Sequence, residues 1–302
     1  MTLPNLLIIG VAKSGTTSLY MYLKQHPEIF MSPVKEPHFF SYDDRSKMTK
    51  GPGDTIPKSI TDFDSYKNLF KDINAQKVIG ECSPTYIYRK EAPARIHELI
   101  PNVKLIAILR NPAERAFSAF MHLLRDHRET TENFSEALEL EELRIKQGWG
   151  PIWHYKRAGL YFEQLINYYS LFDRDQIKII LYEELNQDPK SVLKEIFEFL
   201  DIETNFIPNI SIRYNVSGSP KSETLQTLYE NLFNSPNPIK SISRKIIPEQ
   251  WRWKVTTCLR NRNLERENIP SSLRKELLGF FQDDILNLQK LIGKDLSNWL
   301  RV

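Results

Sequence analysis

Short runs of consecutive apolar residues alternate along the chain with longer segments that have a helical spacing of apolar positions. Several short runs are continuous rather than alternating, which is typical of strands buried on both faces of a parallel sheet. The pattern predicts strands at Leu6–Ile9, Ile29–Met31, Val78–Glu81, Lys104–Leu109 and Ile177–Leu181. It predicts helices near Ser14–Gln25, Glu91–Leu99, Pro112–Arg125, Phe134–Gln147, Leu160–Leu171 and Lys190–Leu200.

The alternation of strands and helices predicts an α/β fold. Its centre is a doubly wound parallel sheet of about five strands, joined by right-handed crossovers. The chain from Glu223 onward is mostly helical in pattern, and no linker rich in Gly, Ser or Pro divides the sequence. We therefore expect one domain over residues 1–302, with a core over residues 5–222 and a helical part over residues 223–302.

The composition is that of a globular protein. The 302 residues are 41% hydrophobic and 26% charged, and the net charge of +3 is too small to indicate a nucleic-acid partner. The longest apolar runs are far shorter than the roughly 18–20 residues of a membrane span, and the first residues lack the features of a signal peptide. Cys82 and Cys258 offer neither a disulfide framework nor metal-ligand spacing. We expect a cytoplasmic protein.

The first predicted strand runs into a loop, "GVAKSGTTSL", that has the features of a phosphate-binding site. The amides of such a loop and the start of the following helix favour a bound anion. Gly15 allows close approach to the backbone, and four residues supply hydroxyl groups that donate hydrogen bonds. These four are Ser14, Thr16, Thr17 and Ser18. An ordinary strand–turn–helix corner is the alternative, but Lys13 in the middle of the loop favours a phosphate.

The position of the lysine separates this loop from that of ATPases and GTPases. Their motif places Gly-Lys-Ser/Thr at the end of the loop, whereas Thr16 follows Gly15 here. Lys13 comes earlier, where it suits a leaving group that is a single phosphate. "GVAKSGTTSL" resembles the 5′-phosphosulfate loop of sulfotransferases that use 3′-phosphoadenosine 5′-phosphosulfate (PAPS). The resemblance implies a P-loop-like fold and a reaction that needs no metal.

A second phosphate site is expected, because PAPS also carries a phosphate on its ribose 3′ oxygen. In "VKLIAILRNPAERAFSAF", a buried strand delivers Arg110 at its end, and Ser118 lies two helical turns further on. A guanidinium and a hydroxyl group are suited to hold one phosphate together. This pair resembles the 3′-phosphate motif of the same family. The alternatives are a surface ion pair of Arg110 with Glu114 and a solvent-facing Ser118.

Sulfonate transfer to a hydroxyl or amine requires a base that accepts the proton of the acceptor. "KEPHFF" follows the second strand, and its carboxyl end belongs to the ligand-binding edge of a parallel sheet. This segment resembles that of the carbohydrate sulfotransferases related to heparan sulfate enzymes, which implies that Glu36 is the base. Glu36 pairing with Lys35 or Lys13 to order the loop is one alternative. His38 is the other candidate base, or else a partly buried neighbour of two phenylalanines.

Other residues receive weaker assignments. Glu81 and Tyr86 follow the third strand and are candidates for the acceptor cleft, as is Arg157 in "YKRAGLYFEQL". The resemblance places a donor-closing loop at "RYNVSGSPKS", where Tyr214 would stack on adenine and Lys221 would reach the 3′-phosphate.

The resemblance implies a sulfotransferase that moves the sulfonate of PAPS to a hydroxyl or amine by in-line displacement, and a saccharide is the expected acceptor. The product nucleotide is adenosine 3′,5′-bisphosphate (PAP). Lys13 would stabilise the charge that grows on the departing phosphate. Two alternatives stay open: a P-loop phosphotransferase, and a nucleotide-binding module without catalysis.

Overall fold

The structure is a computed structural model, and it describes residues 2–42, 49–54, 59–211, 219–220, 264–265 and 267–301. Tyr214 and Lys221, which were assigned to the donor-closing loop, lie outside these ranges, as does most of the segment between residues 212 and 266.

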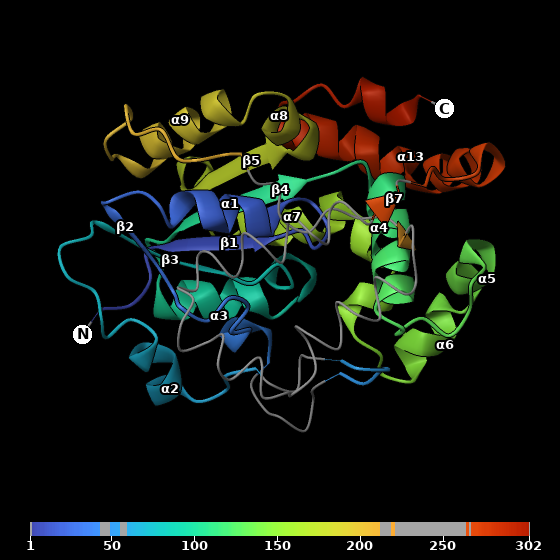
Figure 1. Cartoon of the computed structure of the whole chain (residues 1–302), viewed down its shortest axis with the longest axis horizontal. Coiled ribbons are helices and arrows are strands. Elements are labelled where there is room, and N and C mark those ends of the chain that lie inside the picture. The colour runs from blue at the N-terminus through green and yellow to red at the C-terminus, as the bar shows by residue number, and fades with distance from the viewer. Residues whose placement is uncertain are drawn as a thin grey trace.

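A five-stranded parallel sheet forms the centre of the molecule, with the strand order β2-β3-β1-β4-β5 (Figure 1). Its strands are β1 (Leu6–Gly10), β2 (Ile29–Met31), β3 (Val78–Cys82), β4 (Lys104–Leu109) and β5 (Ile177–Leu181). A separate pair of two-residue strands is antiparallel, β6 (Ser219–Pro220) with β7 (Leu264–Glu265). Because β1 lies between β3 and β4, the loops that follow these three strands open at one edge of the sheet.

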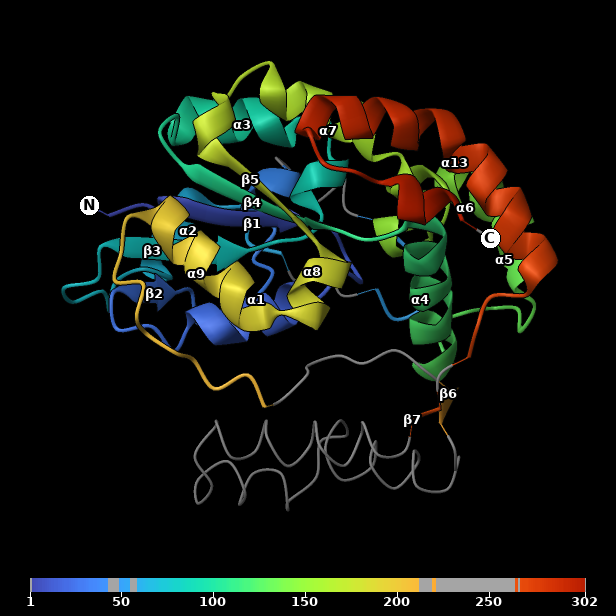
Figure 2. The ribbon, with the colours of Figure 1, turned by 90° about the horizontal axis from the view of Figure 1, so that it is seen from above.

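Helices cover both faces of the sheet, with α3, α7 and α13 on one side and α1, α8 and α9 on the other (Figure 2). The helices are α1 (Thr16–Leu23), α2 (Phe63–Asn68), α3 (Ala92–Leu99), α4 (Pro112–Arg125), α5 (Phe134–Glu139), α6 (Glu141–Lys146), α7 (Tyr161–Tyr169), α8 (Tyr182–Gln187), α9 (Pro189–Leu200) and α13 (Ser271–Ile292). Short 3-10 turns are η1 (Phe39–Ser41), η4 (Tyr86–Tyr88), η5 (Pro151–Trp153), η6 (Arg157–Gly159), η7 (Arg174–Gln176) and η9 (Ser297–Leu300).

The continuous apolar runs of the strands are explained by two hydrophobic cores, one on each face. Leu7 and Ile9 of β1 point into the core beneath α3, α4 and α7, whereas Leu6 and Ile8 point into the core beneath α1 and α9. Successive side chains of a strand point to opposite faces, so a strand covered on both sides needs apolar residues at every position.

The predicted doubly wound parallel sheet is confirmed, and the strands agree with their predicted bounds to within one residue at either end. The predicted start of the first helix at Ser14 is wrong, because Gly15 has a left-handed backbone (φ 87°) and α1 begins only at Thr16. The predicted helix near Phe134–Gln147 is divided into α5 and α6 at Leu140. Two short helices that the pattern did not predict, α2 and α8, complete the fold.

The C-terminal helix α13 packs on α7 and α4 and extends the core of that face. Leu277, Phe281, Ile285 and Leu288 are buried on its inner side. Among the residues that the structure describes, no helix has both the length and the apolar character needed to cross a membrane.

Gly159 lies against Phe281 of α13, and it provides a test of this packing. A Cβ atom at Gly159 would lie 2.7 Å from Phe281 Cε1 and 3.0 Å from Pro112 Cβ. We therefore expect Gly159→Ala to lower the free energy of unfolding by about 1–3 kcal/mol through overpacking. Chemical denaturation measures this change.

The matched control is Gly279→Ala in α13, where a Cβ atom would meet nothing within 4 Å. Alanine is the better helix former, so this variant should gain about 0.5–1 kcal/mol. Equal effects of the two substitutions would contradict the close packing of α13 on the 3-10 turn η6.

Candidate active site

A cleft of about 730 Å³ opens at the carboxyl edge of the sheet. The loops that follow β1, β3 and β4, together with the first turns of α1, α4 and α8, form its walls. Residues from both predicted phosphate motifs and from the "KEPHFF" segment line this one cleft; they include Lys13, Gly15, Thr16, Thr17, Ser18, Glu36, His38, Arg110 and Ser118. The structure therefore brings together residues that lie far apart in the sequence.

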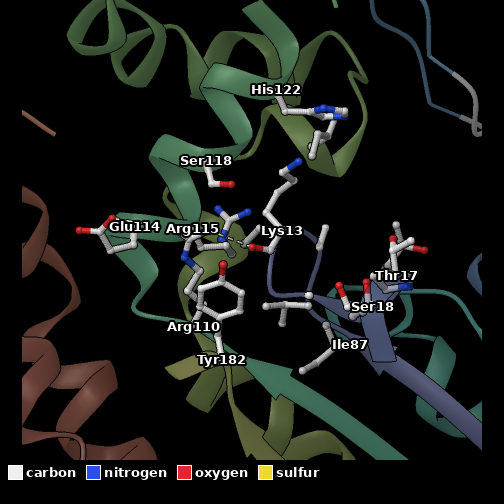
Figure 3. Close-up of a pocket in the computed structure, with 18 of the residues that line it drawn as sticks. Lys13, Thr17, Ser18, Ile87, Arg110, Glu114, Arg115, Ser118, His122 and Tyr182 are labelled. Atoms are coloured by element: carbon white, nitrogen blue, oxygen red, sulfur yellow. Dashed lines mark hydrogen bonds and ion pairs between the residues drawn. The ribbon is translucent and has the colours of Figure 1, made fainter. Parts of the chain in front are cut away.

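The loop after β1 has the conformation of an anion cradle. Lys13 and Gly15 both have left-handed backbones, with φ values of 75° and 87°, and Gly15 is the N-cap of α1. The first turn of α1 contains no acidic residue, so the positive end of the helix dipole faces the cleft without a carboxylate to neutralise it. Thr17 and Ser18 lie along this wall (Figure 3).

Ser14 has a buried hydroxyl group for which the described residues provide no hydrogen-bond partner. A buried polar atom without a partner is uncommon in a native protein and calls for an explanation. A phosphate held in the loop would supply the missing acceptor. The hydroxyl and amide donors of the loop, together with this Ser14 hydroxyl, fit the phosphate at the 5′ end of a nucleotide.

Arg110 joins the second predicted phosphate motif to the first. It follows β4 directly, and its Nη1 donates a hydrogen bond of 3.1 Å to the main-chain oxygen of Lys13. Its guanidinium also lies over the ring of Tyr182, at 4.7 Å from the ring centroid. Ser118 is buried on α4, and Figure 3 shows its hydroxyl and the Lys13 ammonium directed toward the same space.

The structure describes the contacts on which the two alternatives for this motif depend. Arg110 does approach Glu114, with Nη2 and Oε2 3.9 Å apart, but the same guanidinium also contacts the Lys13 loop. Ser118 faces the cleft and not the solvent. The residues fit a nucleotide that carries phosphates at two separate positions, one at the loop and one between Arg110 and Ser118.

Glu36 and His38 come from the segment after β2 and stand opposite the phosphate loop. Both have left-handed backbones, with φ values of 62° and 56°, which for residues other than glycine costs about 1–3 kcal/mol each. The main-chain N–H of Glu36 donates to the Cys82 carbonyl at 2.9 Å, and that of His38 donates to Ser83 Oγ at 3.1 Å. The end of β3 thus holds this strained segment in place.

The charges around Glu36 keep its carboxyl group ionised. The surrounding walls desolvate it, but the positive charges of Lys35 and Lys13 outweigh this and lower its pKa below the ordinary value. Lys35 Nζ forms an ion pair with Oε1, and His38 Nε2 lies 3.7 Å from Oε2. With its side chain 41% exposed, Glu36 presents a carboxylate to the cleft.

His38 is buried and is less free to act than Glu36. Its Nδ1 lies 2.8 Å from Thr85 Oγ1, and its Nε2 faces Glu36. Desolvation lowers the pKa of its imidazole, so the ring is neutral at pH 7. Both predicted bases line the cleft, and His38 is placed to orient the Glu36 carboxylate.

The predicted acceptor residues Glu81 and Tyr86 lie beneath the floor of the cleft and not on its surface. Both are fully buried, and the Tyr86 hydroxyl donates a hydrogen bond of 2.5 Å to Glu81 Oε1. Ser83 and Tyr66 also donate to this carboxylate, at 2.9 Å and 3.2 Å. Arg157 is 54% exposed outside the cleft, where its Nε pairs with Glu142 Oε1 at 3.0 Å. None of these three residues lines the cleft, and their contact with the acceptor stays a prediction.

Tyr88 lines the cleft two residues beyond Tyr86, and no sequence pattern singled it out. Its hydroxyl lies 2.6 Å from His154 Nδ1, while His154 Nε2 lies 3.0 Å from the Trp149 carbonyl. A carbonyl only accepts, so Nε2 carries the ring proton and Nδ1 accepts from Tyr88. Desolvation lowers the pKa of His154 to about 4, which preserves this arrangement at neutral pH.

Two further residues escaped the sequence analysis. Arg115 is 1% exposed, lines the cleft, and donates from Nη2 to the Tyr155 carbonyl at 2.5 Å. Tyr182 packs on Arg110 and Gly15 at the start of α8. The sequence feature that could have identified Tyr182 is its position directly after β5, at the ligand-binding edge of the sheet.

Among the described residues, no group of three or more His, Cys, Asp or Glu side chains is placed to hold a metal ion. The expectation of a metal-free reaction stays a prediction.

The fold and the cleft define a P-loop-like α/β protein in which two predicted phosphate motifs line one cleft. The family model described as "Sulfotransferase domain" matches residues 3–261 of the chain. The chain belongs to this sulfotransferase family.

Individual relatives agree with this assignment. A crystal structure of a sulfotransferase from Alicyclobacillus acidocaldarius is 34% identical, with a TM-score of 0.78 and 100% of both chains covered. The membrane-associated sulfotransferase kil1 of Dictyostelium discoideum is 28% identical, covering 78% of this chain and 64% of that protein. Human heparan sulfate glucosamine 3-O-sulfotransferase 6 is 30% identical, covering 66% of this chain and 52% of its own length. The chain thus spans between half and two thirds of these two curated relatives.

Glu81 makes the stability of the protein depend on pH. Burial raises the pKa of its carboxyl group from 4.5 to about 7, despite the hydroxyl groups that donate to it. The folded state therefore holds the proton more tightly than the unfolded chain, and stability falls as the pH rises from 4.5 through 7. We expect Glu81→Gln to remove about 3 kcal/mol of this loss between pH 5 and pH 8, measured by denaturation at both values.

Glu139→Gln serves as the control, because it replaces a carboxyl group by an amide at an exposed position of α5. An unaltered pH dependence in Glu81→Gln would contradict a protonated Glu81, and would mean that the three hydroxyl groups hold it as a carboxylate.

Proposed function

We propose that the chain is a PAPS-dependent sulfotransferase that acts on a hydroxyl or amine of a saccharide. The observation that carries this proposal is the hydrogen bond between Arg110 and the main chain of Lys13, which places two phosphate motifs in one cleft. The spacing of these motifs suits PAPS, because its two phosphate groups sit at the 5′ and 3′ positions of one ribose.

The loop of Lys13 and the N-terminus of α1 would bind the 5′ end of the nucleotide, with hydroxyl groups from Ser14 to Ser18 as donors. Arg110 and Ser118 would bind the 3′-phosphate. The Tyr182 ring stacks on the Arg110 guanidinium, with the ring centroid 4.7 Å away, and holds it in place. Stacking reduces the side-chain entropy that Arg110 loses when it binds a phosphate.

PAPS supplies an activated sulfonate, and PAP remains once the sulfonate has left. Glu36 accepts the proton of the acceptor as its oxygen or nitrogen bonds to sulfur. The bond between sulfur and the bridging phosphate oxygen breaks, and Lys13 stabilises the negative charge that appears there. Lys35 holds the Glu36 carboxylate ionised before the reaction, and His38 Nε2 lies on its other side, 3.7 Å from Oε2.

A saccharide acceptor is supported by two observations. The human relative is named for transfer to glucosamine of heparan sulfate, which is a property of that protein. Beyond the phosphate motifs, the polar side chains of Asp54, Tyr88, His122 and Arg128 also line the cleft. The proton of Tyr88 is committed to His154, so its oxygen offers lone pairs to a hydroxyl or amine of the acceptor. The cytoplasmic location expected from the sequence stays a prediction.

Arg110→Ala tests the donor site. We expect PAP affinity to fall roughly 10- to 100-fold, because hydrogen bonds to charged groups contribute about 1.5–3 kcal/mol each. Isothermal titration with PAP measures the loss. Arg157→Ala is the matched control, since this arginine lies outside the cleft and pairs with Glu142. Equal affinity of the wild type and Arg110→Ala would remove Arg110 from the donor site.

Glu36→Gln separates an enzyme from a nucleotide-binding module. The variant keeps the shape of the side chain but cannot accept a proton, so we expect kcat to fall roughly 10²- to 10⁴-fold. PAP affinity should stay within a few-fold of the wild type, because the phosphate motifs are untouched. Transfer of labelled sulfonate from PAPS to a panel of saccharides provides the assay.

His38→Asn is the companion variant, and we expect it to retain more activity than Glu36→Gln. Normal turnover in Glu36→Gln together with an inactive His38→Asn would assign the base to His38 instead.

A further inference from the structure

The C-terminal segment of the chain reaches the donor site from outside the residues that the sulfotransferase family model covers, which end at residue 261. We infer that Arg274 of α13 is a positioning residue for the 3′-phosphate site: it draws the Glu114 carboxylate away from Arg110. This inference rests on the proposed function, because it concerns how the donor nucleotide is held.

Glu114 lies between two arginines. Its Oε2 is 3.9 Å from Arg110 Nη2, at the outer limit of an ion pair, whereas its Oε1 forms a close ion pair with Arg274 Nη1. All three side chains are partly shielded from solvent, with exposed fractions of 17% for Arg110, 32% for Glu114 and 25% for Arg274. Figure 3 shows Glu114 directed away from Lys13 and Ser118.

The charge of Glu114 opposes the proposed ligand. Glu114 stands in the first turn of α4 and lines the cleft, so its carboxylate lies near the position expected for the 3′-phosphate. Without Arg274, this carboxylate would turn to Arg110, occupy its guanidinium and repel a phosphate dianion. When Glu114 pairs with Arg274, its negative charge is neutralised. The guanidinium of Arg110 then stays available to bind the ligand.

Three other contacts hold this end of the chain against the same site. Asn111 Nδ2 donates to the Trp299 carbonyl at 2.9 Å. The Trp299 ring packs on Tyr161, whose hydroxyl donates to the Arg110 carbonyl at 2.9 Å. Lys294 Nζ pairs with Glu184 of α8 at 2.7 Å. The segment therefore contacts both the β4–α4 and the β5–α8 connections, which carry Arg110 and its stacking partner Tyr182.

The test compares two nucleotides that differ only in the group that Arg110 is proposed to bind. Binding of PAP and of adenosine 5′-phosphate, which lacks the 3′-phosphate, is titrated for four proteins: wild type, Arg274→Gln, Glu114→Gln and the double variant. We expect Arg274→Gln to weaken PAP binding roughly five- to tenfold and to leave adenosine 5′-phosphate binding unchanged. Glu114→Gln should bind PAP at least as tightly as the wild type, and the double variant should match Glu114→Gln.

Lys275→Gln is the matched control, because it removes the same charge from an exposed neighbouring position. Thermal unfolding of every variant establishes that each one is folded. Equal weakening of both nucleotides by Arg274→Gln would overturn the inference in favour of a purely structural role.

A double variant as weak as Arg274→Gln alone would likewise contradict it, since Glu114 would then not mediate the effect. Absence of PAP binding by the wild type would refute the proposed function itself, and the inference with it. Normal PAP binding by a folded Arg274→Gln would overturn the inference alone.

Discussion

The hydrogen bond from the Arg110 guanidinium to the main chain of Lys13 is the contact on which the candidate site depends. It joins the end of β4 to the loop after β1, and these strands are neighbours in the sheet. A guanidinium that is stacked on Tyr182 and bonded to the loop has few conformations left to lose. The two predicted phosphate motifs are therefore organised relative to each other before a nucleotide arrives, as the proposed binding of a ligand with two separated phosphates requires.

The proposed base belongs to the same electrostatic system. Glu36 is kept ionised by Lys35 and Lys13, so the lysine that would receive the departing charge also lowers the pKa of the group that would take the proton. The left-handed backbones of Lys13, Glu36 and His38 hold these side chains around one cleft. Such strain persists only where the surrounding structure enforces it, and here the buried end of β3 does so through the Cys82 carbonyl and Ser83.

The sequence was informative where a single local cause determines the structure. Continuous apolar runs defined the five strands, because both faces of the sheet are buried, and the Lys13 and Arg110 motifs follow two of those strands directly. It could not show that Glu81 and Tyr86 are buried, since position after a strand does not tell whether a side chain faces the cleft or the layer beneath it. Tyr88, Arg115 and Tyr182 resemble core residues in the sequence and acquire a role only through tertiary contacts. The pairing of Glu114 with Arg274, across 160 residues, leaves no local pattern at all.

A crystal structure of the protein with PAP is the most direct measurement of the central claim. The account predicts the 5′-phosphate in the loop of Lys13, with Ser14 Oγ as a donor, and the 3′-phosphate within hydrogen-bonding distance of Arg110 and Ser118. A nucleotide bound in the reverse orientation, or at a position away from these two elements, would contradict it.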